Sequence, residues 1–350
     1  MKIGICCNVF GPSGGMERYT LDITKSFLER GHQVEIFTKK AYKETLSEFS
    51  IPVHLCNLSI VPGKLRDYLF SLWLLRARKK YSVDALIGCC RNTVSEVAIC
   101  GGTHIGFLQA LKRAPKLSDR LAIHIEKQCY SNAKIVVPHS NLMENELRTL
   151  YHVPKSKIRT LYPPSSLEHF SPCSFEKKSD LRRRFHFPND KKIFLFVSSS
   201  HERKGFPLLR EFFESTDLPI ELVVAGRPIP SRLKNIRYIG FSDKIEELYQ
   251  AADCSILASL YEPFGLAAVE SVMCGTPVIL ANNIGSSEII PGNLKFEFEK
   301  NNLSSLKSAI ECFLSQPTPD CAEQFQFRDL SINTHVSHLE KIIREILSPI

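Results

Sequence analysis

The segment YEPFGLAAVE, residues 261–270, places a Pro-Phe-Gly turn directly before a short apolar run. This pattern predicts a helix that starts near Phe264. The free backbone N–H groups of Phe264, Gly265 and Leu266 would then point at a bound anion, because a helix start also carries partial positive charge.

Two glutamates stand eight residues apart in the same segment, Glu262 before the predicted helix and Glu270 inside it. At ~1.5 Å per helical residue they would lie about 9 to 12 Å apart, which is too far for an acid and a base to act on one bond. The spacing suits a nucleotide sugar instead, with Glu262 on sugar hydroxyls, Glu270 on ribose hydroxyls and the phosphates between them. The alternative is a pair of surface glutamates on a helix.

Two cations follow a strand-like run in SSSHERKGF, residues 198–206, where Arg203 and Lys204 precede Gly205 and an apolar helical pattern. A diphosphate suits this pair, since arginine can bind it through two hydrogen bonds and lysine supplies a point charge. A solvated basic turn is the alternative.

Two glycine-rich turns in the first half also follow strand-like runs. In GPSGGMERYT, Gly14 and Gly15 lead into a helical pattern, where backbone N–H groups can approach an anion closely. The spacing differs from the G-x-G-x-x-G dinucleotide fingerprint. In CGGTHIGF, His104 could hydrogen-bond a sugar or a phosphate, or it could be a structural histidine with satisfied partners.

Short apolar runs alternate with amphipathic segments along the chain, which predicts parallel sheets covered by helices. Strands are expected at 2–8, 33–38, 51–56, 84–90, 96–101, 134–140, 193–199, 221–226, 236–241, 254–259 and 277–282. Helices are expected at 16–30, 65–80, 118–131 and 142–151, and a final amphipathic helix at 329–350.

A proline-rich stretch at 163–172 predicts a boundary between two domains. We expect an α/β protein with two doubly wound, Rossmann-like domains facing one cleft, at 1–165 and 166–328. The final helix, 329–350, could pack back on the first domain. Ligands of such sheets bind at the carboxyl ends of the strands.

Composition narrows the class of protein. The 43% hydrophobic and 23% charged content is that of a globular protein, and the net charge of +8 is compatible with an anionic ligand, an anionic lipid surface or nucleic acid. The 12 cysteines contain no C-x-x-C pair, so buried free thiols in a reducing cytosol are expected.

The N-terminal apolar run stops at Asn8, which favours a strand over a signal peptide. No apolar stretch reaches the ~20 residues that span a bilayer, so we expect neither secretion nor a membrane span.

Taken together, the GG turn, R-K-G, V-A-G-R-P (residues 224–228), E-P-F-G-L-A-A-V-E and C-G-T-P-V-I closely resemble the retaining nucleotide-sugar glycosyltransferases of family four, which have the GT-B fold. The resemblance runs through both domains. The segments VSSSHERKGFPLL and GGTHIGFLQALKR are most similar to bacterial lipopolysaccharide-core glycosyltransferases that add glucose to heptose from UDP-glucose.

The resemblance implies an acceptor-binding first domain and a donor-binding second domain, with Gly226 and Arg227 beside the nucleotide base. The catalytic set is Arg203, Lys204, Glu262 and His104. The donor-binding set is Gly14, Gly15, Gly226, Arg227, Phe264, Gly265, Leu266 and Glu270. The chain departs from the family at Ser198, where many members carry an arginine six residues before the lysine.

The chain has no D-x-D motif, so we expect no metal and no other cofactor, and fixed cations would stabilise the leaving phosphate. A lipid-linked acceptor would require docking on an anionic membrane surface, at the cytoplasmic face of the inner membrane. The segments 65–81 and 111–120 place basic beside apolar residues, as interfacial segments do. For the first, a core helix with a charged end is the alternative.

Other functions remain open at this point. The same fold could serve another acceptor, as in capsule, teichoic or phospholipid glycosyltransferases. A sugar-nucleotide epimerase would need acid and base residues on both sides of one ring carbon, and no such set is visible. A binder without catalysis is disfavoured because both glutamates and both cations occur together. Nucleic acid is disfavoured because the basic residues are spread over both domains.

Overall fold

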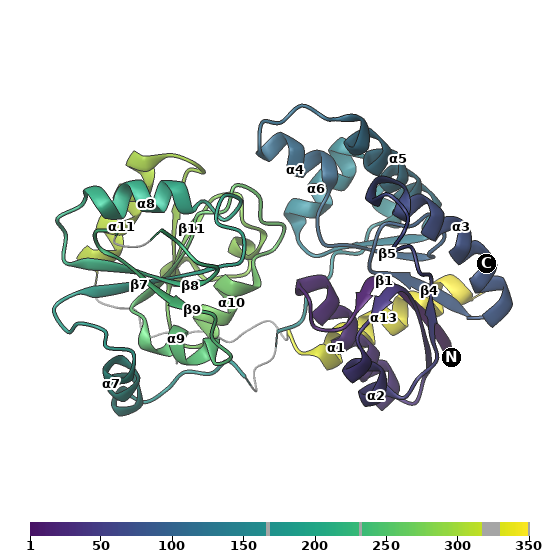
Figure 1. Ribbon diagram of the computed structural model, residues 1–350, viewed down its shortest axis with the longest axis horizontal. Helices are drawn as coiled ribbons and strands as arrows, with labels where there is room; N and C mark the ends of the chain where they lie inside the picture. Colours follow the sequence, from purple (N-terminus) through teal and green to yellow (C-terminus); the bar gives the residue numbers. More distant parts are fainter. Residues whose placement is uncertain (166–168, 231–232, 317–329, 349–350) are drawn as a thin grey trace. The chain divides into compact units, whose positions relative to one another are not determined.

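The computed structural model describes residues 1–165, 169–230, 233–316 and 330–348. It divides into two compact units, Met1–Pro164 with Leu330–Ile350, and Ser165–Asp329 (Figure 1). Part of the predicted boundary, 166–168, and the ends of the predicted final helix, 329 and 349–350, lie outside the described residues.

The first unit is built on a six-stranded parallel sheet in the order β3-β2-β1-β4-β5-β6. Its strands are β1 (Lys2–Phe10), β2 (Gln33–Ala41), β3 (Val53–Leu55), β4 (Ala85–Gly88), β5 (Val97–Cys100) and β6 (Ile135–Pro138). The inner strands are continuous apolar runs because helices cover both faces of the sheet. In β1, Ile3 and Ile5 belong to one core and Cys6 belongs to the core on the other face.

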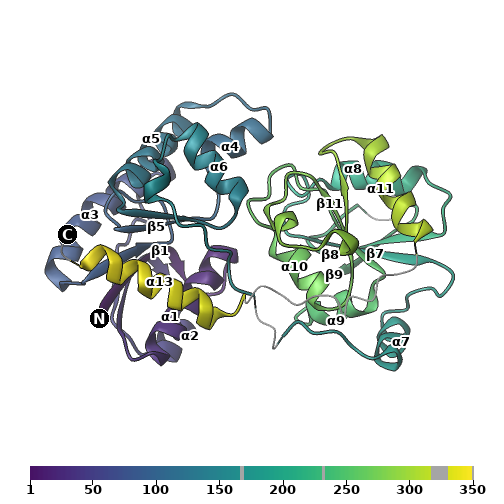
Figure 2. The ribbon, with the colours of Figure 1, turned by 180° about the vertical axis from the view of Figure 1, so that it is seen from behind.

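Helices cover the two faces of this sheet. They are α1 (Gly15–Glu29), α2 (Lys43–Phe49), α3 (Arg66–Tyr81), α4 (His104–Ala110), α5 (Leu117–Asn132), α6 (Asn141–Leu150) and α13 (Ile332–Leu347), with short 3₁₀ turns η1 (Gly63–Leu65) and η2 (Lys155–Lys157). Phe27 of α1 and Leu339 of α13 share one core, while Phe70 and Leu74 of α3 pack on the other face. Figure 2 shows α13 lying beside α1.

A buried cluster of aromatic side chains joins α13 to this unit. His335 Nδ1 lies 2.9 Å from the Tyr162 carbonyl oxygen, which can only accept, so Nδ1 carries the proton and Nε2 accepts from the Tyr19 hydroxyl at 2.8 Å. The His139 ring packs edge-on against Tyr19. Burial lowers the pKa of His139 to about 3 and that of His335 to about 4, so both rings are neutral in the folded chain.

The second unit repeats the plan, with a six-stranded parallel sheet in the order β12-β11-β10-β7-β8-β9. The strands are β7 (Lys192–Ser198), β8 (Ile220–Gly226), β9 (Ile236–Gly240), β10 (Cys254–Leu257), β11 (Val278–Ala281) and β12 (Lys295–Phe298). The helices are α7 (Phe175–Arg184), α8 (Phe206–Ser215), α9 (Ile245–Ala251), α10 (Leu266–Met273) and α11 (Leu303–Ser315), with 3₁₀ turns η3 (Gly285–Glu288) and η4 (Gly292–Leu294).

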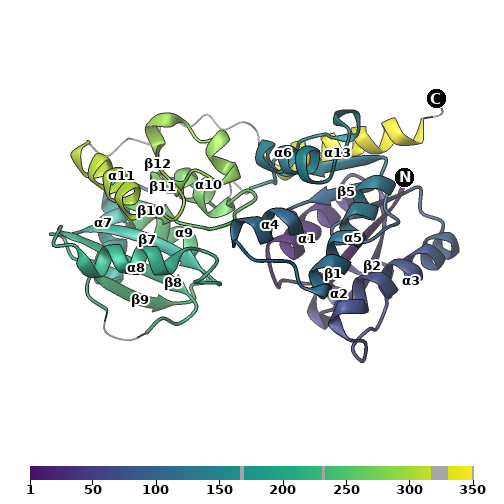
Figure 3. The same ribbon diagram turned by 90° about the horizontal axis from the view of Figure 1, so that it is seen from above.

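Within this unit α8 and α11 cover one face of the sheet, and α9 and α10 cover the other (Figures 1 and 3). Phe194 of β7 packs between Phe213 of α8 and Phe313 of α11. The prediction of an α/β fold with two doubly wound parallel sheets is therefore confirmed.

Every predicted strand is present, while several observed elements had no predicted range, among them β12 and α7. The edge strand β12 reads KFEF, too short and too charged to stand out. The helix α7 is densely charged, and only its Leu181 is buried. All described cysteines are free thiols and most are buried, as expected, while Cys321 lies outside the described residues.

Candidate active site

The order of the second sheet reverses between β7 and β10, and open α/β sheets bind ligands at the carboxyl ends of the strands beside such a point. β7 ends at Ser198 and is followed by Arg203 and Lys204, whereas β10 ends at Leu257 and is followed by Glu262. The fold therefore brings these two predicted cations and this predicted carboxylate to one place.

The three charged side chains contact one another directly. Lys204 Nζ donates to Glu262 Oε2 at 2.5 Å, and Arg203 Nη1 lies 3.6 Å from the same oxygen. Ser259 Oγ also donates to Glu262 Oε2, at 3.1 Å. The Lys204 and Glu262 side chains are only 15% and 12% exposed. Because two cations face one carboxylate, the cluster carries an excess positive charge that suits an anionic ligand.

A glycine makes this cluster possible. Gly205 has φ +79°, and a Cβ atom there would lie 2.0 Å from the carbonyl oxygen of Ala258, the residue after β10. The Leu260 N–H also donates to the Arg203 carbonyl at 2.9 Å. The turn after β7 thus packs directly on the segment after β10, which places Lys204 beside Glu262.

The start of α10 corrects one prediction. The helix begins at Leu266 and not near Phe264, because Gly265 has φ +92°, a left-handed conformation that does not belong to an α-helix. Phe264 is buried, and its carbonyl accepts from Ser286 N at 2.7 Å. The first-turn N–H groups of α10 therefore start at Leu266.

Glu270 lies within α10, and Glu262 lies before it, so the start of the helix stands between the two carboxylates. Tyr249 OH of α9 donates to Glu270 Oε2 at 3.3 Å. Burial, followed by the Glu270 charge, raises the pKa of Tyr249 well above its usual value, so the hydroxyl stays protonated as a donor. One oxygen of Glu270 is thus oriented from behind by a buried tyrosine.

Gly226 and Arg227 lie at the carboxyl end of β8, beside the end of β7. Gly226 has φ +123°, and a Cβ atom there would lie 2.0 Å from the Ser198 carbonyl oxygen, while Arg227 N donates to the same oxygen at 3.0 Å. His201, which was not predicted from the sequence, bridges this contact. Its Nε2 donates to the Arg227 carbonyl at 2.9 Å, and its Nδ1 lies 3.0 Å from Ser198 Oγ. Ser198 is buried and offers no charge at the end of β7.

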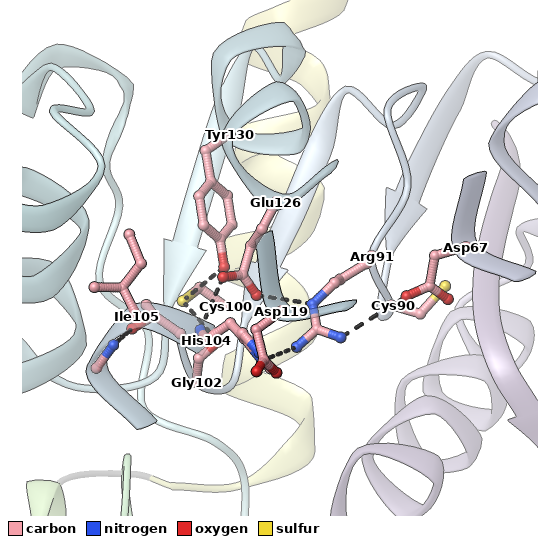
Figure 4. Close-up of polar contacts among 12 residues, drawn as sticks. Asp67, Cys90, Arg91, Cys100, Gly102, His104, Ile105, Asp119, Glu126 and Tyr130 are labelled. Carbon is pink, nitrogen blue, oxygen red and sulfur yellow. Dashed lines mark hydrogen bonds and ion pairs between the residues drawn. The ribbon is translucent and has the colours of Figure 1, made fainter. Parts of the chain in front are cut away.

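The remaining predicted residues belong to the first unit. Gly14 precedes α1, and Gly15 is its first residue. His104 is the first residue of α4, and both of its ring nitrogens have partners: Nε2 lies 2.9 Å from Asp119 Oδ1, and Nδ1 lies 3.3 Å from Arg91 Nη2 (Figure 4). Arg91 and Asp119 were not predicted from the sequence, although Arg91 follows a buried strand as the other site residues do.

Among the described residues, no group of three or more His, Cys, Asp or Glu side chains is arranged to hold a metal ion.

Two protein-family models match the chain in succession. The model described as Glycosyltransferase Family 4 matches residues 13–169, and the model described as Glycosyl transferases group 1 matches residues 177–326.

Curated relatives agree with these matches. The chain is 43% identical over 317 residues to a protein of Burkholderia thailandensis named a probable transglycosylase, with 89% of this chain and 86% of the relative covered. A D-inositol 3-phosphate glycosyltransferase of Thermobispora bispora is 24% identical over 322 residues, covering 78% of this chain and 74% of the relative.

Solved structures show the same fold at low sequence identity. WaaG, described as a glycosyltransferase involved in lipopolysaccharide biosynthesis, has a TM-score of 0.77 at 16% identity, covering 99% of this chain and 98% of WaaG. HepE of Anabaena, in complex with UDP and glucose, has a TM-score of 0.77 at 16% identity, covering 99% and 100%. The chain therefore belongs to the group 1, family 4 glycosyltransferases and has the GT-B fold.

Proposed function

We propose that this glycosyltransferase moves a hexose, glucose in the first instance, from a UDP-sugar to a lipid-linked saccharide of the lipopolysaccharide core. Transfer proceeds with retention of anomeric configuration and without a metal ion. The observation that carries the proposal is the cluster of Lys204, Arg203 and Glu262 at the point where the order of the second sheet reverses.

The charge of the cluster supports the departure of a nucleoside diphosphate. In glycosyl transfer the bond from the anomeric carbon to the diphosphate oxygen breaks, and negative charge grows on that oxygen. Lys204 and Arg203 are held in place before the reaction by Glu262 and by the Tyr261 carbonyl, so they need little reorganisation to stabilise that charge. The first turn of α10, which begins four residues after Glu262, adds backbone N–H groups that can also bind a phosphate.

The positions of the two glutamates support a nucleotide sugar as the anion. Glu262 can accept hydrogen bonds from sugar hydroxyls when the ligand takes over part of its contact with Lys204. Glu270, oriented by Tyr249, can accept from a ribose. HepE, which shares the fold, has been solved with UDP, with UDP and glucose, and with UDP-glucose, which favours a UDP-sugar as the donor.

An acceptor on a membrane is supported by apolar side chains that face solvent beside basic ones. On α3, Leu72 and Leu75 are 42% and 46% exposed, and the last turn of the helix contains Arg78, Lys79 and Lys80. Leu117, next to Lys116, is 83% exposed. Such surfaces suit an anionic lipid interface, here the cytoplasmic face of the inner membrane. No helix in the described ranges is both long and apolar enough to cross a bilayer.

A second candidate keeps the fold and the donor and changes the acceptor. Several relatives at 24–26% identity are named D-inositol 3-phosphate glycosyltransferases, which favours a small phosphorylated acceptor.

A thermal-shift panel of UDP-, GDP-, ADP- and CMP-sugars in EDTA tests the proposed donor. A ligand at ~100 times its Kd adds about 2.7 kcal/mol of stability, enough to measure. We expect a shift with UDP-sugars that is reduced in Glu270→Gln. Glu214→Gln, which changes a half-buried carboxylate of α8 paired with Arg210, is the matched control and should shift as the wild type does. No shift with any sugar nucleotide would refute the proposed donor site.

A further inference from the structure

The first unit contains a cavity of about 420 Å³ at the carboxyl ends of β1, β4 and β5. Its wall includes Asn8, Asp67, Arg91, His104, Glu126 and Tyr130. Small-molecule sites span ~300–1,000 Å³, so this volume suits one small ligand. Figure 4 shows Arg91 lying between the carboxylates of Asp67 and Glu126.

The charges of this cavity balance one another. Arg91 Nε donates to Glu126 Oε1 at 3.0 Å, and Nη1 lies 3.8 Å from Asp67 Oδ2. On the other side of Asp67, Lys39 forms an ion pair with its carboxylate and donates to Asn8 Oδ1 at 2.8 Å. Two cations therefore face two carboxylates, and the cavity offers no excess positive charge.

This balance differs from that of the second unit, where Arg203 and Lys204 face a single carboxylate. A phosphate that entered the cavity would contact Arg91 only by approaching Asp67 and Glu126 as well. Like charges in contact are an effective way to reject a wrong ligand. The cavity therefore disfavours the binding of anionic ligands.

The same groups suit hydroxyls. A hydroxyl group donates one hydrogen bond and accepts others, and the wall presents acceptors on Asp67 beside donors on Arg91. His104 stiffens this arrangement. The Lys116 backbone N–H, then His104, lower the pKa of Asp119 to about 2, so Asp119 is an acceptor and His104 Nε2 carries the proton. His104 Nδ1 then accepts from Arg91 Nη2 at 3.3 Å and orients the guanidinium.

We propose that this cavity binds an uncharged sugar ring of the acceptor, and that Asp67 determines the preference for it over a phosphorylated sugar. This proposal rests on the proposed function, because only a glycosyltransferase would use the bound sugar as its acceptor. Asp67 acts by neutralising Lys39 and Arg91, so its removal should leave the cavity with an excess positive charge.

The test measures binding of three probes by titration calorimetry and saturation-transfer NMR, without nucleotide: methyl α-D-glucopyranoside, methyl α-D-mannopyranoside and glucose 6-phosphate. The full chain is compared with Asp67→Asn. Asp217→Asn is the matched control, since Asp217 carries the same charge, pairs with Lys234 and is 95% exposed in the second unit. Lys39→Gln removes a cation and should act in the opposite direction to Asp67→Asn.

We expect the wild type to bind a methyl glycoside at least about tenfold more tightly than glucose 6-phosphate, a factor that corresponds to ~1.4 kcal/mol. Asp67→Asn should remove most of this gap, Lys39→Gln should widen it, and Asp217→Asn should leave it unchanged. Unfolding temperatures of the variants report whether the fold is kept.

The proposal is overturned if no probe binds, if glucose 6-phosphate binds the wild type as tightly as the glycosides, or if Asp67→Asn leaves the gap unchanged. Failure of the donor is distinguishable, because the sugar-nucleotide panel tests it separately. If the cavity of the first unit is selective for the glycosides but no sugar nucleotide binds the protein, the sugar site stands and the proposed donor is refuted.

Discussion

Gly205→Ala should damage the candidate site through backbone contacts alone. The new methyl group would lie 2.0 Å from the Ala258 carbonyl oxygen and 2.7 Å from its carbonyl carbon. Neither atom belongs to a flexible side chain, so the turn after β7 must move away from the segment after β10. Lys204 precedes Gly205 directly and would move with the turn, away from Glu262.

The size of the effect follows from two contributions. At φ +79° a residue with a Cβ costs roughly 1–2 kcal/mol more than glycine. Overpacking against backbone adds about 1–3 kcal/mol. Gly240 isolates the first contribution, because its φ of +83° is nearly the same and a Cβ there meets no atom within 4 Å. Gly205→Ala should therefore be the more destabilising change by about 1–3 kcal/mol.

Scanning calorimetry and steady-state kinetics measure both consequences. At roughly 2–4 °C per kcal/mol, the second unit of Gly205→Ala should melt about 2–12 °C below that of Gly240→Ala. Transfer should fall up to ~100-fold in Gly205→Ala, the effect of a misplaced catalytic group, and little in Gly240→Ala. Equal melting temperatures and equal activities of the two variants would refute the role assigned to this close approach.

Three further predictions concern single groups. Lys204→Ala should lower kcat by about 100-fold or more with a smaller change in KM, because the cation stabilises charge that develops during the reaction. If steady-state kinetics instead show that kcat falls and KM rises by equal factors, Lys204 only tethers the donor. Tyr249→Phe should weaken UDP binding by about 1 kcal/mol in calorimetry, since Glu270 loses its orienting hydrogen bond; unchanged affinity would count against the ribose assignment. His139 and His335 have folded pKa values of about 3 and 4, so below pH ~6.5 only the unfolded chain takes up their protons. The free energy of unfolding of the first unit, measured by urea denaturation, should therefore fall by about 3 kcal/mol in total between pH 7.5 and 5.5. A free energy of unfolding that stays level over this range would contradict the assignment of buried neutral rings.

The strands could be predicted because parallel strands covered on both faces are nearly continuous apolar runs, as in the sequence of β1. The short edge strand β12 has no such signal, since Glu297 and Lys295 alternate with its two phenylalanines. The sequence predicts the existence of α10 because a Pro-Phe-Gly turn directly precedes a short apolar run. Its first residue depends on the left-handed conformation of Gly265, which a glycine permits and does not require.

The candidate site was predictable as a set of residues and not as a geometry. Arg203, Lys204 and Glu262 stand out because each follows a strand in a conspicuous local pattern. Their direct contact depends on Gly205 and Ala258, 53 positions apart, and no local pattern reports it. The charge balance around Arg91 was missed for the same reason, because Glu126 lies 35 residues farther along the chain.

The most direct test of the donor site is calorimetry of UDP and UDP-glucose in EDTA with the wild type and Glu262→Gln. If Glu262 holds the sugar and its partners hold the diphosphate, the substitution should weaken UDP-glucose by about tenfold. It should leave UDP as tight as before or tighter, since Lys204 loses a competing carboxylate. An equal loss for both ligands, or no binding of either to the wild type, would contradict the assignment of this cluster to a nucleotide-sugar donor.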